Sequence, residues 1–205
     1  MIKLNFSVSD IIYNSWDKFK SEPFFWIALA IISLSLGFIS DFGFNVDAES
    51  FETNFNPFGL LGSFFSMYLS ASITLISINY MRGESISFHD LIKVDFNKFI
   101  HYLLTSLFCG LLIMIGLVFF IFPGIYLIVR LMFAQYLVLD KNITFFDAIK
   151  LSWKMTEDNG LDLFSFLLAM LVLLIIGFFS FFLGLILAIP IIWLATAKLY
   201  IVFNK

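Results

Sequence analysis

Long apolar runs separated by short polar segments dominate the chain. A helix needs about 20 apolar residues to cross the hydrocarbon core of a bilayer, within a range of roughly 17–25. Six runs predict membrane-spanning helices, the fourth shorter than the others, over 23–40, 60–81, 99–121, 125–139, 161–179 and 184–203. The sequence Phe-Pro-Gly at 122–124 is expected to break the chain before the fourth span. The pattern predicts an all-α polytopic membrane protein whose six helices form three hairpins.

A repeated polar pattern precedes each predicted hairpin. Its three copies are Ser7, Asp10 and Trp16; Ser87, Asp90 and Phe96; and Thr144, Asp147 and Trp153. The third copy matches the first closely at a constant offset along the chain, whereas the second copy is a weaker match. A serine or threonine followed three residues later by an acid is a helix-capping pattern, and the acid also suits the positive end of the helix dipole. The pattern predicts three capped helix starts.

Apolar residues recur at helical spacing behind each cap, with lysine and aspartate on the opposite face. Such short amphipathic helices are typical of the membrane interface, with Trp16, Phe96 and Trp153 as interfacial anchors. Alternatively, these helices cap the cytoplasmic end of the bundle and pack on one another. The repeat predicts one membrane domain over 1–205, built from repeat-like units of about 7–81, 87–139 and 144–203.

Composition agrees with the membrane class, and charge adds an orientation. The chain is 61% hydrophobic and 13% charged, against roughly 45–50% apolar and about 25% charged residues in soluble domains. Lysine and arginine gather before the first span, between the second and third, between the fourth and fifth, and at the C-terminal end. The charged residues of the 41–58 connection, in contrast, are all acidic. The positive-inside rule then places both termini in the cytoplasm, and the expected location is a bacterial cytoplasmic (inner) membrane.

Arg130 is the only charge deep inside a predicted span. A charge there costs about 2.5–3.5 kcal/mol on insertion scales, so intramembrane ionisable residues are functional candidates. One interpretation is a structural anchor that reaches the outer interface or pairs with Asp41 or another acid of 41–58. The other is a contact to a ligand or a lipid phosphate, which the guanidinium fork suits.

Ser66, Ser70 and Thr74 form a polar stripe along one face of the second span, at four-residue spacing. Small residues in this arrangement usually let two helices approach, with hydroxyls bonding across the contact. A substrate pathway would use similar residues, so both interpretations stay open. In the sixth span, Pro190 is expected to kink the helix or break it locally.

Patterns typical of enzymes, metal sites and cofactor sites are missing from the predicted spans. They contain no carboxylate pair, no nucleophile beside a base and no cluster of metal ligands. Basic residues alternate with acids beside the membrane, which argues against nucleic-acid binding. The sequence therefore predicts no catalytic residue, metal or cofactor. The expected partners are membrane lipids, together with a membrane-protein partner or a second copy of the chain.

One stretch resembles a known family. The sequence FPGIYLIVRLMFAQYLVLD at 122–140, followed by DAIKLSWKMT at 147–156, is similar to the membrane domain of glycerophosphoryl diester phosphodiesterases and to related uncharacterised bacterial six-span inner-membrane proteins. The resemblance implies a six-span fold. In the phosphodiesterases a soluble domain carries the hydrolase chemistry, and the resemblance extends to no such domain here. It therefore supports the fold more than an activity.

Three functional hypotheses follow from these features. The leading one is a non-enzymatic membrane protein that scaffolds or organises lipid and protein partners. The alternative is a small transporter or channel with a site near Arg130, the polar stripe and Pro190. An intramembrane enzyme is the weakest hypothesis, since no acid–base pair is visible.

Overall fold

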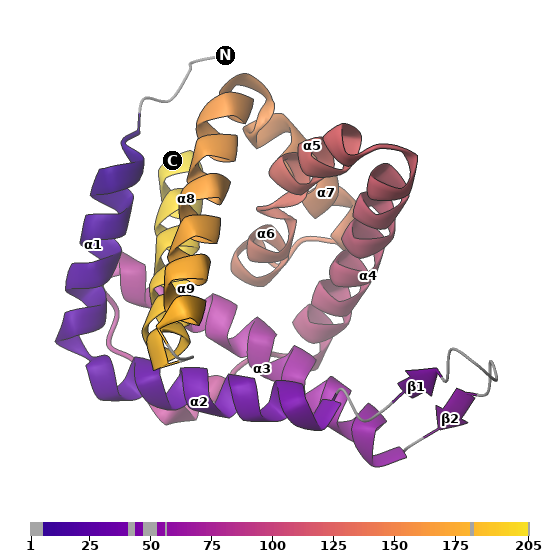
Figure 1. The fold of residues 1–205 in the computed structure, drawn as a ribbon, viewed down its shortest axis with the longest axis horizontal. Coiled ribbons are helices and arrows are strands. Elements are labelled where there is room, and N and C mark those ends of the chain that lie inside the picture. The colour runs from indigo at the N-terminus through magenta and orange to yellow at the C-terminus, as the bar shows by residue number, and fades with distance from the viewer. Residues whose placement is uncertain (1–5, 41–43, 47–52, 56, 181–182, 205) are drawn as a thin grey trace.

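The computed structural model describes residues 6–40, 44–46, 53–55, 57–180 and 183–204 (Figure 1). Side chains are described for 6–37, 59–180 and 183–204. The α-helices are α1 (Val8–Ser21), α2 (Pro23–Ser40), α3 (Pro57–Arg82), α4 (Phe96–Phe119), α5 (Ile121–Leu131), α6 (Ala134–Lys141), α7 (Phe145–Met155), α8 (Gly160–Phe179) and α9 (Leu183–Phe203). Two short 3₁₀ helices are η1 (Phe88–Ile92) and η2 (Glu157–Asn159). Strands β1 (Phe44–Val46) and β2 (Thr53–Phe55) pair antiparallel within the 41–58 connection. Helices therefore dominate, as predicted.

Five helical segments of the described residues are long and apolar enough to cross a membrane. They are Gly59–Arg82, Phe96–Phe119, Ile121–Lys141, Glu157–Phe179 and Leu183–Phe203. The pair α1 and α2 provides a sixth if it is counted as one span, and it bends by 99° at the junction of its two helices. The prediction of an all-α chain is confirmed, and five to six of its described helical segments are long and apolar enough to span a membrane.

The predicted start of the fourth span is wrong. The chain breaks at Phe120, which is extended, and α5 already begins at Ile121, so Phe-Pro-Gly lies inside the first helical turn. Proline is tolerated there because its missing N–H would have no partner in the first turn anyway. Gly124 then lets α5 approach α4 closely, since an added Cβ would lie 2.9 Å from the backbone nitrogen of Leu117.

The sixth span is continuous, so a break at Pro190 is ruled out. Helix α9 runs from Leu183 to Phe203 with Pro190 buried inside it. Its neighbours along the helix, including Ala188 and Ile191, are buried as well, and such packing holds a proline in place within an apolar helix. The predicted separation of the fifth and sixth spans is confirmed, because α8 ends at Phe179 and α9 begins at Leu183.

Helix α9 lies at the centre of the bundle, in contact with α1, α2, α3 and α8. Leu194, Leu199 and Tyr200 of α9 are fully buried, as are Trp26 of α2 and Ile78 of α3. The outer helices α4 and α8 instead expose long apolar faces; α8 lies against α9, and α4 lies on the other side of the bundle (Figure 1). Exposed apolar faces of this kind suit contact with lipid chains rather than with water.

The first and third copies of the repeat form matching helices. Helices α1 and α7 begin at corresponding positions of the two copies, and α2 and α8 begin at the same offset from each other. The predicted caps form in both copies, because the hydroxyl of Ser7 accepts a hydrogen bond from the Asp10 N–H at 3.4 Å, and that of Thr144 from the Asp147 N–H at 3.3 Å. The two copies therefore share local structure as well as sequence.

The second copy does not form the predicted amphipathic α-helix. Only the five-residue 3₁₀ helix η1 is present, although the Ser87 N–H donates to the Asp90 carboxylate at 2.6 Å as a capping box requires. Side chains of α3 bind the carbonyls that a longer helix would use: Ser72 donates to Leu91 at 2.7 Å and Tyr68 donates to Val94 at 3.1 Å. These two bonds replace the helical hydrogen bonds of this segment.

Candidate functional site

Arg130 lies at the end of α5 between two aromatic side chains. Its guanidinium carbon is 4.8 Å from the centroid of the Tyr126 ring and 5.4 Å from that of Trp153. Tyr126 lies one turn earlier on α5, so the arginine leans toward the start of its helix, as helical side chains do. Trp153 comes from α7, and the two rings meet edge to face at 5.7 Å.

The guanidinium of Arg130 is buried without a neutralising partner among the described residues. The residue is 9% exposed, and its Nε and Nη1 atoms are enclosed with no hydrogen-bond acceptor. Contact with aromatic rings contributes about 0.5–2 kcal/mol, whereas removing an ion from water costs several kcal/mol. The rings alone therefore do not offset the burial of this charge. The predicted partner Asp41 lies outside the described residues.

The backbone around Arg130 is held by α7. Because α5 ends at Leu131 and α6 begins at Ala134, this break leaves backbone groups without helical partners. The Ser152 hydroxyl donates to the Arg130 carbonyl at 2.8 Å and accepts from the Phe133 N–H at 3.3 Å. Ser152 is fully buried and thus bridges the break. The carbonyl of Arg130 is fixed while its side chain lies between the rings.

Of the three predicted interfacial anchors, the structure brings only Trp153 to this site. Trp153 is 38% exposed and contacts Arg130, whereas Trp16 stacks on Phe19 at 5.6 Å and Phe96 is exposed at the start of α4. The role of Ser152 was not predicted. Its signal in the sequence was the Ser-Trp pair shared by the first and third copies of the repeat.

A second polar cluster surrounds Asp140 at the end of α6. Arg82 of α3 donates to the carboxylate with both terminal nitrogens, at 2.5 Å to Oδ1 and 2.7 Å to Oδ2. The Tyr200 hydroxyl donates to Oδ2 at 2.7 Å, and the Asn204 amide does so at 3.2 Å. Both oxygens of Asp140 are therefore occupied, and the cluster ties together the C-terminal ends of α3, α6 and α9. The sequence showed Arg82 and Asp140 only as separate charges near span ends, and it did not indicate Tyr200 or Asn204.

Further bonds bring other helix ends to the same region. The Tyr80 hydroxyl of α3 donates to the Lys18 carbonyl of α1 at 2.9 Å. The Lys98 ammonium of α4 donates to the Leu139 carbonyl of α6 at 3.3 Å. These bonds thus hold the end of α1 and the start of α4 close to the Asp140 cluster. These segments carry part of the lysine and arginine bias on which the predicted orientation depends.

Ser66 and Ser70 of the polar stripe make no hydrogen bond to another helix among the described residues, whereas the Thr74 hydroxyl lies within hydrogen-bonding reach of the Tyr102 hydroxyl of α4. Ser70 donates to the Ser66 carbonyl at 2.9 Å and Thr74 donates to the Ser70 carbonyl at 2.8 Å, both within α3. The predicted close contact of two helices is not present beside Ser66 and Ser70. These residues line a pocket of about 330 Å³ together with Tyr102 and Ser106 of α4.

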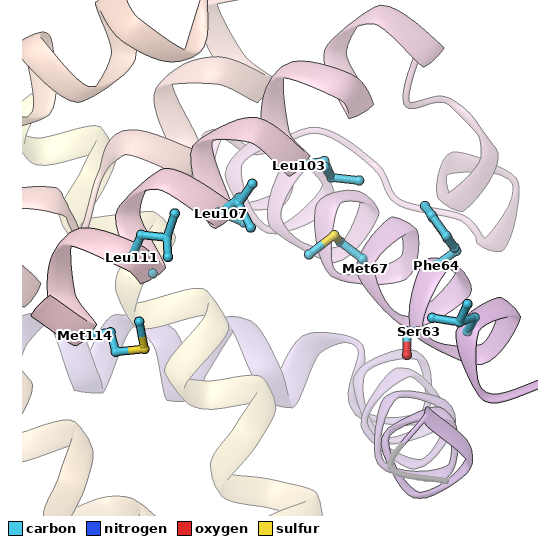
Figure 2. A pocket seen from close by; sticks show the side chains of 10 residues that line it. Ser63, Phe64, Met67, Leu103, Leu107, Leu111 and Met114 are labelled. Atoms are coloured by element: carbon cyan, nitrogen blue, oxygen red, sulfur yellow. The ribbon is translucent and has the colours of Figure 1, made fainter. Parts of the chain in front are cut away.

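A larger apolar groove adjoins this pocket, between the first half of α3 and the middle of α4. Figure 2 shows side chains of both helices along it. The groove has a volume of about 500 Å³ and shares Ser63, Met67 and Ser106 with the polar pocket. The other lining residues are Leu60, Phe64, Leu103, Leu107, Gly110, Leu111 and Met114. The groove and the pocket separate Ser66 and Ser70 from α4.

The structure does not assemble the composite site predicted for a transporter. Arg130, Tyr126 and Trp153 line neither the groove nor the polar pocket. Pro190 is buried in α9 and lines neither space. The described residues therefore form two separate candidate sites, an aromatic arginine site and an α3–α4 groove. They contain no cluster of three or more histidine, cysteine, aspartate or glutamate side chains that would hold a metal ion.

Comparison of the chain with protein-family models, with curated proteins and with solved structures found no match. The resemblance of 122–156 to the membrane domain of the phosphodiesterases stays a prediction. Functional inference accordingly depends on the geometry of the two candidate sites.

Proposed function

We propose that the chain is a non-enzymatic integral membrane protein that holds membrane lipids in place and so organises lipid and protein partners. The observation that carries this proposal is the α3–α4 groove. Its walls are almost entirely apolar, and both helices are long and apolar enough to cross a membrane. A groove between two such helices faces lipid acyl chains, whose chemistry matches its leucine, phenylalanine and methionine lining.

The shape and polarity of the groove favour a glycerolipid over a purely apolar occupant. Gly110 leaves room in the wall, because no heavy atom lies within 4 Å of a Cβ added there. The hydroxyls of Ser66, Ser70 and Tyr102 line the adjoining pocket. The Ser70 hydroxyl already donates to the Ser66 carbonyl, whereas the Ser66 hydroxyl makes no hydrogen bond with the described residues and can donate to an ester oxygen. A glycerolipid can place its acyl chain in the apolar groove and its ester group beside these hydroxyls in the polar pocket.

The wider arrangement belongs to the same proposal. Helices α2 and α3, α4 and α5, and α8 and α9 pack together in pairs, which supports three hairpins and six spans. The exposed Trp16 and Trp153 support α1 and α7 as interfacial helices. The lysine and arginine bias supports cytoplasmic termini in a bacterial inner membrane. A membrane-protein partner or a second copy of the chain would then contact lipid-facing helices.

The groove is tested by filling it. In Gly110→Leu the new side chain enters open space and also replaces a helix-interior glycine, so the fold is expected to persist. Native mass spectrometry of protein extracted in mild detergent counts the phospholipids that remain bound. We expect the wild-type protein to retain at least one phospholipid that Gly110→Leu loses.

Gly37→Leu is the matched control, because Gly37 also lies in an apolar helix with open space around an added Cβ. This variant is expected to retain lipid as the wild-type protein does. Equal retention by Gly110→Leu, or no retained lipid in the wild-type protein, would contradict the proposal.

A transporter is the second candidate, and the polar pocket favours it. The pocket places four serine hydroxyls and Tyr102 beside one another next to a lipid-facing groove. Swelling of proteoliposomes in small neutral solutes, compared between wild-type protein and Ser66→Leu, separates the two functions. Solute entry that Ser66→Leu abolishes would favour transport, and impermeable vesicles would favour lipid holding.

A further inference from the structure

The aromatic arginine site holds a positive charge that the described residues leave without a counter-charge. Arg130 is 9% exposed, and no carboxylate among the described residues pairs with it. Its Nε and Nη1 atoms are enclosed without an acceptor. Buried cations are normally paired with an anion or hydrogen-bonded throughout. The described part of this site therefore lacks the anion that would normally balance such a cation.

The two rings position the guanidinium without using its hydrogen-bond donors. Tyr126 and Trp153 contact it through their π faces at 4.8 and 5.4 Å. A cation–π contact uses the charge of the guanidinium and none of its N–H groups. The third nitrogen, Nη2, is not among the enclosed atoms without a partner. The N–H groups of the guanidinium thus have no hydrogen-bond partner among the described residues, and Nη2 is the end at which a ligand can approach.

The surrounding backbone makes this placement rigid. Ser152 joins the Arg130 carbonyl to the Phe133 N–H, and Thr156 donates to the same carbonyl at 3.4 Å. Ser152 and Thr156 are fully buried, and Trp153 lies between them on α7. The same helix therefore fixes both the backbone of Arg130 and one of its aromatic walls. Preorganised donors are what an anion site requires.

We propose that Arg130, held by Tyr126 and Trp153, binds a phosphate group. Planar guanidinium donors match two oxygens of a phosphate or phosphate ester, and arginine is the usual residue where such bidentate recognition matters. The proposal is independent of the α3–α4 groove, because the residues of this site do not line it. The phosphate can belong to a lipid headgroup or to a soluble ion, and the experiment below separates these sources.

The test measures thermal unfolding of the purified full chain in phosphate-free, lipid-free detergent. One arm adds phosphatidylglycerol, a second adds diglucosyl diacylglycerol, which has no phosphate, and a third adds 10 mM inorganic phosphate against chloride of equal ionic strength. We expect phosphatidylglycerol, inorganic phosphate or both to raise the unfolding temperature by several degrees more than the glycolipid does, because the glycolipid has acyl chains for the α3–α4 groove but no phosphate for Arg130. A shift with the lipid alone assigns the site to a headgroup, and a shift with inorganic phosphate alone assigns it to a soluble phosphate.

Arg130→Gln removes the charge and is expected to abolish the shift with inorganic phosphate and to lower the shift with phosphatidylglycerol to that with the glycolipid. Lys150→Gln is the matched control, because Lys150 also lies over a ring, that of Phe146 at 4.3 Å, but belongs to the surface of α7. This variant is expected to keep the shift. An unchanged shift in Arg130→Gln, or an equal shift with the phosphate-free glycolipid, would overturn the proposal.

The wild-type protein alone also tests the site if Arg130→Gln does not fold. Native mass spectrometry with equimolar phosphatidylglycerol and diglucosyl diacylglycerol, repeated with inorganic phosphate, reports which species stays bound. Retention of one phosphate-bearing species in preference to the glycolipid supports the proposal. Equal retention of both lipids with no bound phosphate contradicts it. Loss of lipid from Gly110→Leu concerns the groove only, so the two proposals fail separately.

Discussion

Arg82 and Arg130 are the two arginines of the chain, and their guanidinium groups have very different surroundings. Arg82 is 36% exposed at its side chain and still forms two hydrogen bonds to the Asp140 carboxylate. Arg130 is far more buried and forms no side-chain hydrogen bond with the described residues. Arg130, whose charge costs more to bury, therefore has fewer hydrogen-bond partners than Arg82 among the described residues.

This difference is the basis for proposing a structural role for Arg82 and a binding role for Arg130. The Asp140 cluster is complete, since its carboxylate accepts from Arg82, Tyr200 and Asn204 and joins three helix ends. Within the described residues the Arg130 site is incomplete, because rings and backbone hold the cation but no anion among these residues neutralises it. A complete cluster stabilises the fold, whereas an incomplete one has donors left for a ligand.

The largest effect is expected from Asp140→Asn. The substitution keeps the size of the side chain but removes the charge that Arg82 pairs with, and one oxygen that accepts from Tyr200 and Asn204. We expect the free energy of unfolding, measured by SDS titration in mixed micelles, to fall by about 2–4 kcal/mol. Asp17→Asn is the control, since Asp17 pairs with Lys20 on the exposed face of α1, and it should cost under about 1 kcal/mol. An equal loss of unfolding free energy in both variants would show that the Asp140 cluster stabilises the fold no more than a surface ion pair does.

Ser152→Ala ranks second because it opens the backbone bridge beneath Arg130. The Phe133 N–H loses its acceptor and the Arg130 carbonyl keeps only the long bond from Thr156. We expect a loss of about 1–3 kcal/mol in the same titration. Ser15→Ala is the matched control from the first copy of the repeat, because Ser15 is equally buried but bonds only to the Ile11 carbonyl of its own helix. Similar losses in both variants would mean that the bridge contributes nothing beyond burial.

Arg130→Met is expected to cost no stability in detergent free of phosphate and phospholipid. The substitution removes a buried cation and retains apolar packing between Tyr126 and Trp153, so the free energy of unfolding should stay equal or rise by up to about 1 kcal/mol. Arg82→Met, which leaves Asp140 without its cation, should lower it by about 2 kcal/mol. A loss in Arg130→Met as large as that expected for Arg82→Met would identify Arg130 as a structural anchor.

The smallest effect concerns Asp90, an acid with a lysine partner outside the spans. The Lys93 ammonium at 2.7 Å, and then the Ser87 N–H, hold the pKa of Asp90 below its ordinary value. The stabilisation is therefore complete above the ordinary pKa of the carboxyl and is lost as the pH falls through the lower, folded value. Unfolding of wild-type protein and Asp90→Asn should differ by about 0.5 kcal/mol at pH 6 and converge in acid. A difference that is independent of pH would exclude the ion pair as its cause.

The helix starts show how far the sequence alone predicts this molecule. Ser7 with Asp10 and Thr144 with Asp147 form the predicted caps, because a cap depends on residues three positions apart. The same pattern at Ser87 and Asp90 gives only a 3₁₀ turn, since side chains of α3 bind the carbonyls of Leu91 and Val94. That competition involves residues of a different helix, well separated along the chain, and no local pattern contains it.

The candidate sites show a similar division. Arg130 was a candidate from the sequence because a lone charge in an apolar run is costly wherever the helix packs. Its aromatic walls and the Ser152 bridge depend on how α7 packs against α5, and the Asp140 cluster depends on three helix ends that meet from distant parts of the chain. The α3–α4 groove depends on two helices that stay apart, which no hydrophobic pattern encodes.

The sequence by itself determined the membrane class, the apolar helices and the capped starts of α1 and α7, because hydropathy and capping act over one helix or less. Tertiary structure alone decided the break between α5 and α6 and the continuity of α9 through Pro190. It also decided that Arg82 forms an ion pair with Asp140. These outcomes depend on contacts between helices distant in sequence. A charge shows its energetic cost in the sequence, but its partners become visible only in the packed bundle.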